Sequence, residues 1–327
     1  MISGLRVLGY RDARGLTGFW AEEPDTEFEA LVRGKALSAL LSAALVDVGV
    51  ELPPASASQL LREYGELEAI YHGLSRYADR LAAGLAYLSD WACWKGVQHV
   101  WLGGGALEPP VGESLLPLLA TSLERWGCPL SVALLPAHPE ESALLGAPLF
   151  GDWEAAPIGA AFPVVDLGGT NLRWGLHLKT APLCEGKPFA SIEASGKQPH
   201  HAEEDGNRDR LLSLIARRMA DLVDEAALRA APLAGFCLTT PGSLDATGAV
   251  IEGANALPEW RYPPFHLKEA LEWELGEVLR EKPLPPVTIA PDSVAHALSA
   301  APFSGAYKKW GALLIGSGLG NCALART

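Results

Sequence analysis

Alternating and continuous apolar runs divide the second half of the chain into short strands and helices. Three strands are expected at 162–167, 172–178 and near 189–194, the second after a Gly-Gly turn. A polar segment follows, and then a helical pattern over 208–228 and an apolar strand over 233–240 that stops at a Pro-Gly pair. The remaining pattern predicts a helix at 266–280, a strand at 287–290 and a further helix from Val294. The order therefore begins βββαβα and continues with one more strand and helix.

The same order can be traced through the two ends of the chain. Residues 310–326 form an apolar strand, a Gly-Ser-Gly turn and a second strand, and residues 5–10 supply a third strand. A long helical region over 25–92 comes next. The elements that follow are a strand at 99–102, a glycine triplet, a helix at 113–126, a strand at 130–135 and a helix from Pro139. If Thr327 were joined to residue 2, the halves would match, which predicts a duplicated α/β fold with a cleft between two domains.

Composition and charge narrow the classes of function. The 327 residues are 49% apolar, which suits one large core or two smaller ones, and two domains are expected. A formal net charge of −13 disfavours nucleic acid and anionic membranes as partners and favours a small ligand. The longest apolar stretch, 36–46, is too short to span a bilayer, and no signal segment opens the chain, which predicts a cytoplasmic protein. The five cysteines form no close pairs and are expected to be reduced thiols.

Several stretches resemble motifs of one enzyme family. Residues 166–173 (DLGGTNLR) look like the first phosphate motif of the ROK sugar kinases, within the hexokinase/actin/Hsp70 superfamily. Residues 316–320 resemble the second phosphate motif, and 102–105 resemble the adenosine motif. The sugar-binding stretches of the family are matched by 239–245 and 253–260, and the segment of the catalytic aspartate by 291–295. The order is rotated relative to the family, since the adenosine motif comes first here.

The resemblance implies a particular architecture. It predicts two duplicated ribonuclease-H-like, or actin-like ATPase, domains with an interdomain cleft, in a circularly permuted chain. The larger nucleotide-binding domain would comprise 1–150 and about 303–327, and the smaller domain about 160–302. Residues 150–161, rich in Gly, Ala and Pro, would be the connector that joins the usual termini of the family.

Glycine turns after apolar strands let backbone N–H groups approach phosphate oxygens, although a lone Gly-Gly is more often a simple hairpin turn. The resemblance implies an ATP site that draws on all three turns, and Asp166, at the end of its strand, could hold Mg²⁺ through water. The alternative for Asp166 is to bind turn N–H groups. The phosphate and ATP residues are Asp166, Gly168, Gly169, Thr170, Asn171, Arg173, Gly316, Ser317, Gly318, Gly103, Gly104 and Gly105.

Asp292 is the expected general base, because phosphoryl transfer to a sugar needs a carboxylate that accepts the hydroxyl proton. For an isolated Asp before a helix, an N-cap would be the usual interpretation. Asn255 suits a polyol because its amide can donate and accept, although an asparagine in a Gly/Pro-rich loop is more often a turn former. The resemblance adds Gly242 and Glu29 as substrate contacts, while a solvated acid on a helix face remains an alternative for Glu29.

The chain also departs from the family. Many ROK proteins carry an acid and a histidine and then a cysteine-rich zinc motif, where this chain has residues 18–23 (GFWAEE). No cysteine lies between residues 1 and 92, so no structural zinc is expected. Phe19 and Trp20 could instead face a modified sugar or cyclitol. His200 and His201 precede Glu203, and the pattern indicates a mobile acidic loop rather than a metal cluster.

These observations predict an ATP- and Mg²⁺-dependent kinase of a sugar or sugar-like polyol, a phosphotransferase with an alcohol acceptor. One alternative is the same enzyme with polyphosphate as donor, and another is a sugar-binding sensor of the same fold without catalysis. A ROK repressor is disfavoured, because the permuted half fills the place of its DNA-binding segment. The family also leads us to consider a homodimer.

Overall fold

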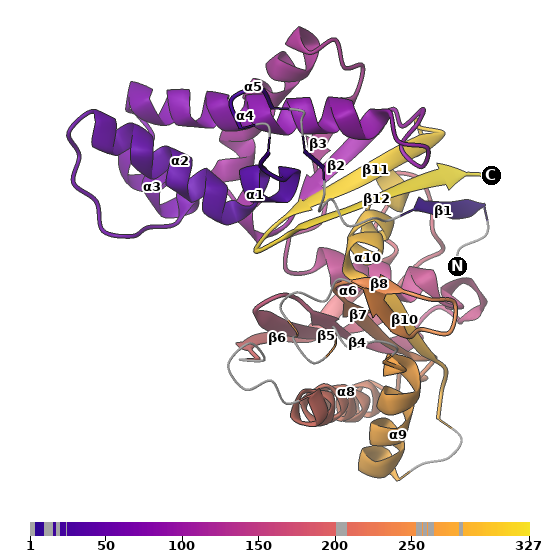
Figure 1. The fold of residues 1–327 in the computed structure, drawn as a ribbon. Coiled ribbons are helices and arrows are strands. Elements are labelled where there is room, and N and C mark those ends of the chain that lie inside the picture. The colour runs from indigo at the N-terminus through magenta and orange to yellow at the C-terminus, as the bar shows by residue number, and fades with distance from the viewer. Residues whose placement is uncertain are drawn as a thin grey trace. The chain divides into compact units, whose positions relative to one another are not determined.

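The computed structural model describes residues 4–9, 16–17, 20–23, 25–200, 208–252, 257, 260, 265–280 and 284–327. The chain divides into two compact units (Figure 1). Unit 1 comprises residues 1–6, 136–306 and 326–327, and unit 2 comprises residues 7–135 and 307–325. Each unit contains a five-stranded sheet with helices packed against it. Among the described helices, none is both long and apolar enough to cross a membrane.

Unit 1 is built on a sheet with the strand order β10-β7-β4-β5-β6. The pairs β10/β7 and β7/β4 are parallel, whereas β4/β5 and β5/β6 are antiparallel. Its strands are β4 (Ala161–Leu167), β5 (Asn171–Lys179), β6 (Ala190–Pro199), β7 (Phe236–Thr240) and β10 (Val287–Pro291), with a small hairpin of β8 (Ser243–Leu244) and β9 (Val250–Glu252). Its α-helices are α6 (Ser142–Gly146), α8 (Arg208–Leu228), α9 (Leu267–Leu279) and α10 (Asp292–Ser299).

Side chains alternate along the strands of unit 1, so the sheet has one apolar face and one face that carries polar groups. Val165, Leu167 and Leu172 belong to the apolar cluster that α8 and α9 complete. Because side chains alternate along a strand, Asp166 and Arg173 are directed to the opposite face. Helices α6 and α10 lie on that face, as Figure 1 shows.

Unit 2 has a sheet with the strand order β1-β12-β11-β2-β3. The pair β12/β11 is antiparallel, and β11/β2 and β2/β3 are parallel. Its strands are β1 (Leu5–Gly9), β2 (His99–Gly103), β3 (Ser131–Leu134), β11 (Lys309–Ile315) and β12 (Leu319–Arg326), although residues 5, 6 and 326 at the strand ends are grouped with unit 1. Its α-helices are α1 (Phe28–Val32), α2 (Gly34–Asp47), α3 (Ala57–Tyr64), α4 (Glu68–Ser89) and α5 (Val111–Arg125).

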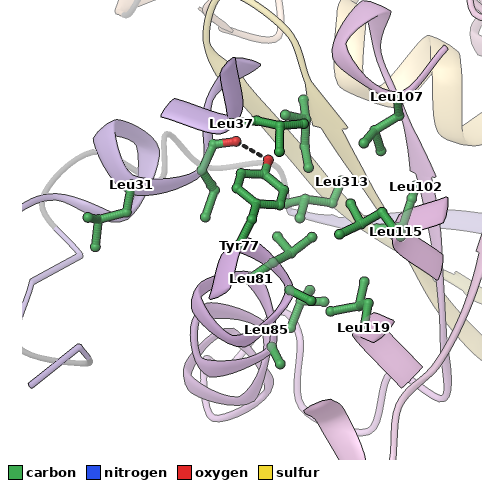
Figure 2. Packing of buried hydrophobic residues seen from close by; sticks show 14 of the residues in the cluster. Leu31, Leu37, Tyr77, Leu81, Leu85, Leu102, Leu107, Leu115, Leu119 and Leu313 are labelled. Atoms are coloured by element: carbon green, nitrogen blue, oxygen red, sulfur yellow. Dashed lines mark hydrogen bonds between the residues drawn. The ribbon is translucent and has the colours of Figure 1, made fainter. Parts of the chain in front are cut away.

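Leucines from the helices and the sheet fill the core of unit 2 (Figure 2). Tyr77 of α4 lies among them with 0% of its surface exposed, and its hydroxyl donates a hydrogen bond to the carbonyl oxygen of Val32. This bond satisfies the polar end of an otherwise apolar residue and ties the end of α1 to α4. Burial raises the pKa of Tyr77 far above its ordinary value, so the hydroxyl stays protonated and can donate.

Most of the predicted elements are confirmed, with shifts at their ends. Helix α8 has the predicted bounds, while β6 extends to Pro199 because it pairs with β5 as far as Asn171. Helix α10 begins at Asp292, two residues earlier than predicted. The helix expected from Pro139 is the short α6, which ends at Gly146.

Contacts place residues 136–160 in unit 1, whereas the sequence predicts that residues 136–150 belong to the other domain. The reason is close packing between α6 and α10. A Cβ added at Gly146 would lie 1.7 Å from the carbonyl oxygen of Ala295, so only glycine allows this approach. The assignment of the two units to nucleotide and sugar domains stays a prediction.

The segment expected to be a connector is part of the packed interior of unit 1. The 3-10 turn Trp153–Ala155 buries Trp153 with 1% of its surface exposed. Its indole N–H donates to Nε2 of His177 at 3.0 Å, and Lys179 Nζ lies 4.2 Å from the ring centre. Lys179 Nζ also donates to the carbonyl oxygens of Trp153, Glu154 and Ala156. These contacts fix the segment to strand β5.

Candidate functional site

A buried aspartate lies at the centre of the candidate site in unit 1. The register pairs Asp166 of β4 with Thr239 of β7 on one side and with Arg173 of β5 on the other. The Thr239 hydroxyl donates to Asp166 Oδ1, and Arg173 Nη1 donates to Oδ2 at 3.0 Å. The side chain of Asp166 is 2% exposed, so this ion pair is shielded from water. Asp166 therefore has a fixed orientation at the end of its strand.

The predicted base, Asp292, is close enough to Asp166 to be influenced by its charge. Asp292 directly follows β10, and β10 and β4 both pair with β7 in parallel, so both carboxylates lie at the same edge of the sheet. Burial, with the charge of Asp166 as a second cause, raises the pKa of Asp292 to about 7, and the Ser293 N–H opposes the shift. The cap of α10 is Pro291, and Asp292 Oδ1 accepts from Ser293 N at 2.6 Å. The N-cap interpretation of Asp292 is therefore wrong, although its carboxylate does bind a helix N–H.

A serine and a histidine that the sequence analysis missed lie on the same face. His296 of α10 is buried, and its Nδ1 is hydrogen-bonded to the hydroxyl of Ser142 in α6. Burial lowers the pKa of His296 to about 4, Asp166 opposes the shift and Arg173 adds to it. The imidazole is thus neutral near pH 7. No local pattern identifies this pair, because its members are 154 positions apart.

The turn between β4 and β5 contains the predicted phosphate residues of unit 1. Gly168 N donates to the carbonyl oxygen of Asn171 at 3.0 Å, and Asn171 Nδ2 donates to Thr170 Oγ1 at 2.9 Å. The N–H groups of Gly169 and Thr170 have no partner within the described part of the chain. The turn is partly exposed, so these donors are accessible to an anion. A Cβ at Gly168 would lie 3.1 Å from Arg173 Nη1, so a side chain there would press on the ion pair of Arg173 with Asp166.

The other two glycine turns come together in unit 2. Strands β11 and β2 are parallel neighbours, and Leu314 pairs with Gly103, so their following turns lie side by side. Gly316 N donates to Gly318 O at 3.0 Å, and Gly316 O accepts from Gly34 N at the start of α2 at 2.9 Å. The structure thus brings Gly103 to Gly105 next to Gly316 to Gly318, and a ligand shared by these turns stays a prediction.

Gly104 is the position of this cluster where a side chain is least tolerated. Its φ is +95°, and an added Cβ would lie 2.4 Å from the carbonyl oxygen of Ile315. We expect Gly104→Ala to lower the free energy of unfolding by about 2 kcal/mol, from backbone strain and the clash. Chemical denaturation of this variant should be compared with Gly105→Ala, where the nearest contact of the Cβ is Glu108 Oε1 at 3.9 Å. Equal stability of the two variants would contradict this account.

The predicted substrate residues have different outcomes. Gly242 lies in unit 1 after Thr240 and Pro241 and has a φ of +99°, which favours glycine. Glu29 belongs to unit 2, where a Cβ on Gly318 would lie 3.0 Å from Glu29 Oε1. This places Glu29 beside the turn of residues 316–318, and both its contact with a sugar and the binding of phosphate by this turn stay predictions. Asn255, Phe19, His201 and Glu203 lie outside the described residues.

The residues around Asp166 could hold Mg²⁺ only by accepting hydrogen bonds from its water ligands. Thr239 and Arg173 each occupy one of the carboxylate oxygens of Asp166, and Oδ1 of Asp292 accepts from Ser293. A carboxylate has about four acceptor sites, so Asp166 can still accept from the water ligands that Mg²⁺ tends to keep. Within the described ranges, no three His, Cys, Asp or Glu residues are grouped as a metal site.

No protein-family model and no curated protein matches the chain, whereas its structure matches solved structures. The ROK hexokinase from Thermus thermophilus is 20% identical with a TM-score of 0.36, over 50% of this chain and 46% of the hexokinase. A protein of Listeria monocytogenes described as a proposed N-acetylmannosamine kinase is 23% identical with a TM-score of 0.36, over 49% and 46% of the two chains. A ROK family protein from Streptococcus pneumoniae, solved with sucrose, is 19% identical with a TM-score of 0.33, over 51% and 46%. The chain thus spans less than half the length of each of these proteins, and over about half of its own length its structure is similar to those of ROK-family sugar kinases.

Proposed function

We propose that the protein transfers a phosphoryl group from ATP to a hydroxyl group of a sugar or sugar-like polyol. The observation that carries this proposal is the pair of carboxylates in unit 1, with the pKa of Asp292 raised to about 7 next to a fixed Asp166. A general base is most effective when its pKa lies near the working pH. The turn after β4 offers the backbone N–H groups of Gly169 and Thr170 as donors, which supports phosphate as the second ligand.

In this proposal Asp292 accepts the proton of the attacking hydroxyl. The Ser293 N–H holds one oxygen of Asp292, which orients the carboxylate and leaves its other oxygen to face the substrate. Asp166 keeps its place through Thr239 and Arg173 and, by its charge, makes Asp292 more basic. When bound, Mg²⁺ would neutralise charge on the phosphates, with Asp166 holding its water ligands. The N–H groups of Gly169 and Thr170 would bind phosphate oxygens.

Activity should depend on pH through Asp292. Its base form is the ionised carboxylate, so kcat/KM should rise as the pH increases through about 7 and level off above it. At pH 5 we expect about a hundredfold lower kcat/KM than at pH 8, because each unit below the pKa reduces the ionised fraction about tenfold. Initial rates between pH 5 and 9 at limiting sugar measure this profile. A flat profile from pH 5 to 8 would exclude Asp292 as the base.

The acceptor class can be found by measuring ADP release with MgATP across hexoses, amino sugars and cyclitols. We expect release that depends on one class of acceptor. ADP release that does not depend on the acceptor would overturn the kinase proposal. Stabilisation of the protein by a sugar without any ADP release would overturn it as well. Stabilisation without release would instead favour a catalytically silent sensor. Sugar-dependent phosphorylation with polyphosphate but not with ATP would change the donor alone.

We further infer that the two sheets descend from one duplicated ribonuclease-H-like unit in a rotated chain order. The support is that both sheets have the same pattern. From β10 to β6 in unit 1 and from β3 to β1 in unit 2, two parallel pairs are followed by an antiparallel pair. In unit 2 the antiparallel pair of this pattern, β11 and β12, comes from residues 309–326, while the edge strand β1 comes from residues 5–9.

A further inference from the structure

The carbonyl groups of the turn Gly168–Asn171 receive hydrogen bonds from an unexpected residue. His200 Nε2 lies 2.9 Å from the carbonyl oxygen of Gly168, and the backbone N–H of His200 donates to Thr170 O at 3.3 Å. The register explains the contact, because Asn171 pairs with Pro199 at the end of β6 and places His200 next to the turn. The sequence pattern instead predicts that His200 belongs to an acidic loop.

These bonds give the turn a distinct polarity. The carbonyl oxygens of Gly168 and Thr170 accept from His200, and that of Asn171 accepts from Gly168 N. The N–H groups of Gly169 and Thr170 are without a partner within the described ranges. Thr170 Oγ1 accepts from Asn171 Nδ2, which leaves the hydroxyl hydrogen of Thr170 to donate elsewhere. Acceptors that are already occupied, beside donors that are not, attract an anion.

We propose that His200 is a positioning residue for the phosphate turn. Its imidazole N–H holds the Gly168 carbonyl so that this peptide group cannot rotate and direct its oxygen at a phosphate. His200 acts through the turn and does not itself need to touch the phosphate. This inference rests on the proposed function, because it assumes that the turn binds the phosphates of the donor.

Two variants of His200 separate the hydrogen bond from the bulk of the side chain. His200→Leu removes the donor and keeps an apolar side chain, whereas His200→Gln keeps an N–H that can reach the carbonyl. We expect His200→Leu to raise the KM for MgATP about fivefold and to leave kcat within about twofold of wild type. The loss of one hydrogen bond typically weakens binding by about fivefold. His200→Gln should recover most of the loss. His72→Leu, on an exposed histidine of α4 with a side chain 68% exposed, is the matched control and should behave as wild type.

A binding measurement keeps this test separate from the kinase proposal. Calorimetric titration with inorganic tripolyphosphate should show binding to wild type and about fivefold weaker binding to His200→Leu, with recovery in His200→Gln. This result in a protein without sugar-dependent turnover would overturn the kinase and leave the role of His200 intact. The role of His200 is overturned if wild type does not bind tripolyphosphate or if His200→Leu binds it as tightly as wild type. It is also overturned if both variants lower kcat at unchanged KM, since that indicates a loss of folded enzyme.

Discussion

Replacing Asp292 by asparagine is expected to lower kcat for sugar phosphorylation by about a thousandfold, because the variant loses its general base. The fold should persist, since the amide oxygen can still accept from the Ser293 N–H. The raised pKa of Asp292 means that the ionised carboxylate destabilises the native state increasingly as the pH rises from about 4 through 7. At pH 8 the variant should therefore have a melting temperature equal to or above that of wild type.

Steady-state rates and thermal unfolding at pH 8 test this expectation together. Asp209→Asn provides the control, because it is the same chemical change at a side chain of α8 that is 86% exposed. It should leave both quantities unchanged within error. If Asp292→Asn kept a tenth or more of the wild-type kcat, Asp292 would not be the base. A large fall in melting temperature would instead identify Asp292 as a structural residue.

Replacing Trp153 by alanine is expected to lower the free energy of unfolding by about 4 kcal/mol, the typical effect of deleting a fully buried tryptophan. The ring packs edge-on against Phe189 with 5.5 Å between centroids, and its N–H donates to His177. Without the indole, Nε2 of buried His177 loses its donor and Lys179 loses the ring beneath its ammonium group. The segment predicted to be a connector would then lose its main attachment to the sheet.

Guanidinium denaturation followed by far-ultraviolet circular dichroism measures this effect. Trp273→Ala is the matched control in the same unit, because Trp273 is 65% exposed on α9 and should cost less than about 1 kcal/mol. Trp153→Phe should fall between the two, since it keeps an aromatic ring but loses the N–H donor and part of the buried ring volume. Equal stability of the Trp153 and Trp273 alanine variants would show that residues 150–161 are a loose linker after all.

The sequence predicted elements best where a long periodic pattern decided the outcome. Helix α8 has an apolar stripe that includes Leu211, Ile215, Met219 and Leu222, and its predicted bounds agree with the structure. Shorter elements depended on tertiary packing that no local pattern contains. Helix α6 ends at Gly146, the residue whose backbone is in close contact with α10.

Only part of the candidate site could be predicted, because some of its residues come together through tertiary packing that no local pattern contains. Asp166, Arg173 and Asp292 belong to stretches that resemble motifs of a known family, so the sequence could identify them as candidates. Ser142, His296 and His200 reach the site through a helix contact and through the register of β6, and neither is encoded in neighbouring residues. The fully buried Trp153 was missed because a Gly/Ala/Pro-rich segment indicates a surface connector, whereas the contacts with His177 and Lys179 place it in the interior.

The central claim is that Asp292 promotes transfer of a phosphoryl group to a sugar hydroxyl. Phosphorus-31 nuclear magnetic resonance of a reaction with MgATP and the acceptor found in the panel tests it most directly. We expect a new phosphate monoester resonance that grows as ATP is consumed, requires the acceptor and is absent with Asp292→Asn. Formation of inorganic phosphate alone, or the same monoester at an undiminished rate with Asp292→Asn, would contradict the account.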